Sequence, residues 1–179
     1  MLRATLLLAA FLVTASAPSM AAEPEPDNLI VYGEGFAFSV KEPDGWIGDV
    51  EKSQEFAANL ILYPRGASLK SPGTPIIRVL ISRKADEDTS ADLAHDMEQY
   101  RAGYPGVQFK DVAISHPVYS TYPKLFFIPG RFFEYTTYLN PGSGRWQLIS
   151  LAMNKQRQEA TASELSAYKQ IIASLLLFY

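Results

Sequence analysis

The stretch "RFFEYTTYLNPGSGRWQLISLAM", residues 131–153, decides the fold because it holds two strand-like runs joined by a short loop. Residues 131–139 and 145–153 are rich in aromatic and β-branched side chains, which favour strands. Between them, "NPGSG" supplies the proline and glycine that form tight hairpin loops. The stretch therefore predicts an antiparallel pair of strands around which a sheet is built.

The rest of the chain supplies further strands and two helices. Thr89 and Asp92 have capping-box spacing and predict a helix over residues 90–102, and Thr161 with Glu164 predicts a second helix near the C-terminus. Strand-like runs lie at residues 35–40, 56–64, 75–84, 107–115 and 118–129. We predict an α+β fold: a single α/β/α sandwich with a mostly antiparallel sheet of about six to seven strands and helices covering its faces.

A tight corner follows the first of these strands. "FSVKEPDGW", residues 38–46, turns on Pro43, Asp44 and Gly45, residue types that suit a reversal. Trp46 comes next and is either the rim of a site or a plug for one end of the core. We favour the plug, because a large ring just after a corner returns toward the core.

The first residues have the order of a secretory signal peptide. Arg3 precedes an apolar run of about 12 residues, which is shorter than the roughly 20 needed for a membrane-spanning helix. Ser19 and Ala21 suit cleavage after Ala21. We predict a signal peptide at 1–21, a flexible leader at 22–28 and one domain at 29–179, with export to the periplasm or secretion.

Composition limits the classes of partner. The chain has no cysteine, so neither a disulfide framework nor a lipid-bearing cysteine is available. It carries 16 basic and 19 acidic residues, and loss of Arg3 leaves 15 against 19, a net charge of −4. Without a basic block, nucleic acid and stable membrane insertion are not expected. The expected partner is an unknown protein or small molecule.

Several segments together resemble the PsbP-like superfamily. They are "FAFSVKEPDGW", "NLILYP", "IIRVLISRK", the helix after "TSADL", the hairpin "GRFFEYTTYLNPGSGRWQLISLAMN" and the final "YKQIIASLLLFY". This superfamily of α/β/α sandwiches includes photosystem II extrinsic proteins, the Ran-binding Mog protein and bacterial exported proteins. The resemblance implies a noncatalytic binding or assembly-assisting module. It transfers no site residue, and the missing lipid-accepting cysteine departs from the lipoprotein branches.

Metal and cofactor patterns fail on inspection. His95 and His116 are the histidines of the chain, and no paired-histidine motif is present. The run Asp86, Asp88, Ser90 and Asp92 alternates like a calcium loop, but Ala91 and Met97 stand where glycine and a bidentate glutamate are required. Helix-start capping explains the acids instead. We expect no metal and no cofactor.

Patterns for nucleophilic and nucleotide chemistry fail in the same way. The glycines around Ser143 do not form a nucleophile elbow, and "GEGFAF" lacks the third glycine of a dinucleotide fingerprint. A catalytic set formed by residues far apart in the sequence is not excluded by these patterns.

Arg78 interrupts the apolar run "IIRVLI", and Glu134 lies similarly inside "RFFEYTTY". A guanidinium in a covered strand needs a carboxylate or an anion. One interpretation pairs Arg78 with Glu134 beside an aromatic-lined pocket containing Tyr135 and Trp146. The other interpretation, which we favour, places both charges on the solvent face of the sheet.

The sequence thus predicts an exported, noncatalytic binding or assembly-accessory module of unknown ligand. One alternative is a cell-envelope hydrolase with a scattered catalytic set. A further one is a small outer-membrane β-barrel, suggested by aromatic strands and the terminal "LLLFY". Weak ligand-binding candidates are Arg78, Glu134, Tyr135 and Trp146.

Overall fold

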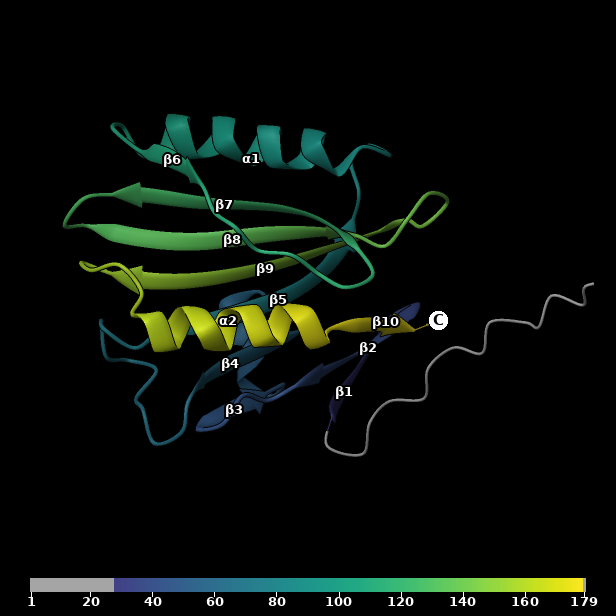
Figure 1. The fold of residues 1–179 in the computed structure, drawn as a ribbon, viewed down its shortest axis with the longest axis horizontal. Coiled ribbons are helices and arrows are strands. Elements are labelled where there is room, and N and C mark those ends of the chain that lie inside the picture. Colours follow the sequence, from purple (N-terminus) through teal and green to yellow (C-terminus); the bar gives the residue numbers. More distant parts are fainter. Residues whose placement is uncertain (1–27, 179) are drawn as a thin grey trace, which may run out of the picture.

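The computed structural model describes residues 28–178, which form ten strands and two α-helices in an α+β arrangement (Figure 1). The strands are β1 Asn28–Gly33, β2 Phe36–Lys41, β3 Trp46–Asp49, β4 Leu60–Pro64, β5 Ile76–Arg83, β6 Gln108–Asp111, β7 Ser120–Ile128, β8 Phe132–Asn140, β9 Gln147–Gln156 and β10 Leu176–Phe178. The helices are α1 Thr89–Gly103 and α2 Ala162–Ser174, and η1 Lys52–Phe56 is a 3-10 helix. The predicted signal peptide and almost all of the predicted leader lie outside the described residues.

The strands form two antiparallel sheets. The larger has seven strands in the order β3-β4-β5-β9-β8-β7-β6, and the smaller has three in the order β1-β2-β10, as counted over residues 28–178. The larger sheet is open, with β3 and β6 at its two edges. The α+β class and the mainly antiparallel pairing are confirmed.

The predicted hairpin is the centre of the larger sheet. Strands β8 and β9 pair in antiparallel register from Phe132↔Gln156 to Leu139↔Ile149. Gly142 and Gly144 in the connecting loop have φ of 118° and 73°, a region that glycine enters without steric cost. Turn residues and strand propensity therefore agree at this hairpin.

Three strands were not predicted, namely the six-residue β1, the four-residue β3 and the three-residue β10. Strand β3 starts at Trp46 itself and pairs with β4, and the three-residue strand β10 pairs with β2. Strands as short as β3 and β10 form because the edge of a neighbouring strand is available for pairing. Their few residues show no clear alternation of apolar and polar side chains that would predict a strand. The predicted strand at 56–64 was too long, since η1 ends at Phe56 and β4 begins only at Leu60.

Both helices are confirmed, but one cap is not the predicted one. Thr161 and Glu164 form the capping box of α2. At α1 the N-cap is Asp88, whose carboxylate accepts from the Ser90 backbone N–H. The Thr89–Asp92 capping box was therefore wrong. Asp92 instead accepts from the backbone N–H of Ala85.

The two faces of the larger sheet are covered differently. On one face, α2 and the smaller sheet enclose the main core, to which Phe38, Leu151 and Tyr168 contribute fully buried side chains. On the other face, α1 packs over β7 and β8 through a smaller cluster that includes Leu93 and Phe126 (Figure 1). Because alternate residues of a strand face opposite sides, this second face can carry its own polar side chains.

Trp46 belongs to the main core, with 7% of its surface exposed. The expected return of Trp46 toward the core is confirmed. Among residues 28–178, no helix combines the length and apolar character needed to span a bilayer.

Candidate functional site

A cleft lies beside α1, where the helix leaves part of the larger sheet uncovered. We call it the α1 cleft. Its floor comes from β5, β8 and β9, one wall from α1 and the opposite wall from η1 and the loop at residues 65–75. The outer part has a volume of about 470 Å³, and a smaller inner part of about 170 Å³ adjoins it through Arg78 and Glu134.

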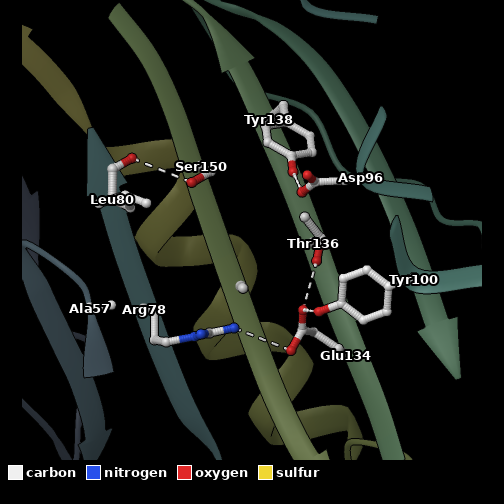
Figure 2. A pocket seen from close by; sticks show the side chains of 10 residues that line it. Ala57, Arg78, Leu80, Asp96, Tyr100, Glu134, Thr136, Tyr138 and Ser150 are labelled. Atoms are coloured by element: carbon white, nitrogen blue, oxygen red, sulfur yellow. Dashed lines mark hydrogen bonds and ion pairs between the residues drawn. The ribbon is translucent and has the colours of Figure 1, made fainter. Parts of the chain in front are cut away.

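The floor of the cleft is built around an ion pair that spans three strands. Arg78 on β5 donates through Nη2 to Oε2 of Glu134 on β8, at 3.2 Å. Strand β9 lies between them, and the residue that it places beside Arg78 is Ala152. A methyl side chain leaves room for the guanidinium to cross this strand, and Figure 2 shows the Arg78 side chain reaching Glu134 across it. The small residue on the middle strand thus permits the pair.

The Glu134 carboxylate is surrounded by donors. Besides Arg78, it accepts from the Tyr100 hydroxyl at 2.5 Å and from the Asn154 amide at 2.8 Å. The Thr136 hydroxyl lies 3.5 Å away. Glu134 is 5% exposed, so burial would be costly without these donors. Burial, followed by the nearby Glu134 charge, raises the pKa of Tyr100, which therefore remains a protonated donor.

A second tyrosine–carboxylate contact lies deeper in the cleft. The Tyr138 hydroxyl on β8 donates to Asp96 on α1 (Figure 2). Burial, and then the hydrogen bond to Asp96, raises the pKa of Tyr138. Since Tyr100 also belongs to α1, these two contacts tie the helix to β8 and fix the width of the cleft.

The outer part of the cleft carries two more cations. The exposed Lys70 lies on the wall formed by the loop. The exposed Arg131, immediately before β8, lines an adjoining hollow of about 350 Å³, which we include in the outer cleft because the two spaces share Tyr104, Glu134 and Asn154. The Arg131 guanidinium stands 5.9 Å from the centre of the Tyr104 ring, within range of a cation–π contact. Tyr104 itself is 41% exposed. Tyr104, Lys70 and Arg131 therefore line the mouth of the cleft, and Arg78 lies on its floor.

The structure unites two of the four predicted site residues and separates the other two. Arg78 and Glu134 pair on the α1 face, whereas Tyr135 faces the main core and donates to Glu159 at 2.8 Å. Trp146 precedes β9 and packs near Arg83. The predicted pocket shared by Arg78, Tyr135 and Trp146 was wrong, because adjacent strand residues point to opposite faces.

The favoured interpretation of both charges as solvent-facing also needs correction. Glu134 is buried, and the Arg78 side chain is 36% exposed within the cleft. Sequence reasoning missed the contact of Tyr100 with Glu134. It also missed Asn154, whose position opposite Glu134 follows only from the β8–β9 register.

The histidines and the acidic run lie outside the cleft. His95 is exposed on α1 beside Gln99, and His116 contacts the carbonyl of Leu175. Of the acids in this run, Asp88 caps α1, and Asp86 accepts from the backbone N–H of Asp88 just before the helix. Within residues 28–178, no group of three or more histidine, cysteine or acidic side chains is arranged to hold a metal ion.

Comparison with known proteins identifies a structural neighbour. The fold is similar to the crystal structure of LpqN, described as involved in cell envelope biogenesis of Mycobacterium tuberculosis, with a TM-score of 0.60 and 15% sequence identity. The match covers 85% of this chain and 91% of that one. No protein-family model matches the sequence, and no curated protein matches it. At this identity the likeness concerns the fold, which LpqN and this chain share over most of their lengths.

Proposed function

We propose that this chain is an exported, noncatalytic accessory protein of the cell envelope, with the PsbP-like α/β/α sandwich, that binds a partner molecule in the α1 cleft. The observation that carries the proposal is the cleft itself, whose floor is held by the hydrogen-bonded Arg78–Glu134 pair. Its mouth offers unoccupied donors and an aromatic surface. The envelope role of LpqN, on a similar fold, supports the same setting.

The noncatalytic part rests on the state of the polar groups. A general base must lie within hydrogen-bond reach of the substrate proton that it takes. Glu134 already accepts from Tyr100, Arg78 and Asn154, and Asp96 accepts from Tyr138. The acidic groups of the floor are thus engaged in holding α1 and the strands together. This arrangement suits recognition better than proton transfer.

The periplasmic location rests on the first residues of the sequence. The basic residue, the short apolar run and the small residues before position 22 favour a cleaved signal peptide. A cysteine-free domain of this size keeps its fold in an oxidising compartment without needing disulfides. We place the mature protein, from Ala22 onward, in the periplasm.

Site-specific photo-crosslinking in cells tests the proposal. A photoreactive residue at Ser71, on the mouth of the cleft, should form a discrete adduct in the periplasmic fraction. The same residue at Lys169, exposed on α2, is the matched control. Mass spectrometry of the recovered protein should show an N-terminus at Ala22. An uncleaved, cytoplasmic protein would refute export, and equal crosslinking at both positions would refute the cleft.

A screen of ester, peptide and glycoside substrates separates binding from hydrolysis. The mature protein should give no turnover above a blank. Turnover abolished by Asp96→Asn would overturn the noncatalytic assignment in favour of an envelope hydrolase.

A further inference from the structure

The charge at the mouth of the α1 cleft is opposite to that of the whole molecule. The full chain has a net charge of −3. The outer cleft, in contrast, is lined by Lys70, Arg78 and Arg131 with Glu134 as its one carboxylate, a local balance of three positive charges against one negative. Clefts of one sign concentrate ligands of the other sign. The local balance therefore favours an anion.

The donors of these cations are largely available. Arg78 reaches Glu134 through Nη2, which leaves the other guanidinium N–H groups without a hydrogen-bond partner among the described residues. Within the same part of the chain, the Lys70 ammonium makes no hydrogen bond or ion pair, and Arg131 rests on the Tyr104 ring. Guanidinium groups bind phosphate and carboxylate oxygens through paired N–H donors. The cleft thus holds the groups that an oxyanion requires.

The wall beside these cations suits a ring that carries hydroxyl groups. Tyr104 is fixed between Tyr100 and Phe132, at ring separations of 5.6 and 5.4 Å, yet 41% of its surface is exposed. Side-chain amides of Asn154 and Gln156 line the same space. A fixed aromatic body gives apolar contact at little entropic cost, and amides both donate and accept. These are the contacts that a sugar ring makes.

We propose that the outer α1 cleft binds an acidic sugar, with its phosphate or carboxylate held by Arg78, Lys70 and Arg131 and its ring against Tyr104. This inference rests on the proposed function, because it names the ligand class of the same cleft. A sugar phosphate and a sugar carboxylate would both accept hydrogen bonds from these cations, and they differ in charge and shape.

Binding measurements with the mature protein test it. Glucose 6-phosphate and glucuronate are the probes, glucose is the neutral probe, and inorganic phosphate lacks the ring. Chemical-shift titration should show binding of at least one acidic sugar at the cleft. The affinity for glucose and for phosphate alone should be at least about tenfold weaker, because each lacks one of the two contact sets. Raising the salt concentration should weaken binding of the acidic sugar.

Variants decide which cations act. Lys70→Gln/Arg131→Gln leaves the Arg78–Glu134 pair intact and should weaken binding about tenfold or more, since two charge-assisted contacts are lost. Lys41→Gln/Lys169→Gln makes the same charge change at exposed positions away from the cleft and should change affinity less than twofold.

Two outcomes of these experiments would overturn the inference. Equal losses in the two double variants would mean that only general charge attraction operates, and absence of binding by both acidic sugars would remove the ligand class. Either result is distinct from failure of the proposed function, because crosslinking through Ser71 does not depend on which ligand class binds.

Discussion

Removal of the Arg78 guanidinium should destabilise the protein more than removal of the Glu134 charge. In Arg78→Met the carboxylate stays buried, with 5% exposure, and keeps only Tyr100 and Asn154 as close donors. Loss of one partner from a buried ion pair costs about 3 to 5 kcal/mol. Because the Arg78 side chain is 36% exposed, we reduce this to about 2 kcal/mol of unfolding free energy.

Glu134→Gln should cost about 1 kcal/mol, because Arg78 can then turn to solvent and the amide oxygen still accepts from Tyr100. The double variant should lose less than the sum of the two, with a coupling energy of about 1 kcal/mol. For a domain of this size, about 2 kcal/mol corresponds to a fall in Tm of roughly 4 to 8 °C.

Urea unfolding followed by tryptophan fluorescence measures these values. Arg83→Met is the matched control, because Arg83 lies on the same strand, is exposed and has no carboxylate partner among the described residues. It should cost under about 1 kcal/mol. If Arg78→Met costs no more than Arg83→Met, or if Glu134→Gln is the more damaging variant, the account of a buried carboxylate held by its donors is refuted.

Three further predictions concern the core and its attachments. Tyr168→Phe should lower the unfolding free energy by about 1 to 2 kcal/mol in urea titration, because the buried hydroxyl bonds the Leu151 carbonyl at 2.8 Å and Thr137 at 3.1 Å; an unchanged midpoint would contradict this. Trp46→Ala should cost about 3 kcal/mol by calorimetry, since the ring is buried in the core, and a loss below about 1 kcal/mol would show that it is not a plug. Burial lowers the pKa of His116, which accepts from the Val118 and Tyr119 backbone N–H groups as a neutral ring. Stability should therefore be constant above the unfolded value of about 6.5 and fall as the pH drops below it, since the unfolded state then binds the proton more readily. Urea midpoints between pH 7.5 and 5.5 should show a smaller fall in His116→Gln than in the natural protein; equal slopes would refute the assignment.

Local signals were sufficient for the elements whose pattern and boundaries agree. Residues 131–153 combine high strand propensity with a Pro- and Gly-containing loop typical of a hairpin. The structure has strands β8 and β9 there, as predicted. The Thr161–Glu164 pair satisfies the free N–H groups of a helix start by itself, so α2 begins where the sequence predicts. The predicted signal peptide also rests on local composition, and it lies outside the described residues.

Strands that depend on a distant partner were not visible locally. Strand β10 has three residues and forms along β2, more than a hundred residues earlier in the chain. Strand β3 exists because β4 provides a paired edge. Backbone hydrogen bonds between such segments depend on the finished fold, and a short sequence run carries too few residues to report them.

The sequence by itself determined the α+β class, the central hairpin and both helices, and it raised the pairing of Arg78 with Glu134 only as the interpretation that was not favoured. Only the tertiary structure decided that Glu134 meets Arg78 across Ala152, that Tyr135 turns to the opposite face, and that α1 leaves a cleft beside the pair. Caps and turns are satisfied within a few residues. Strand register and helix placement, in contrast, are set by burial summed over the whole core.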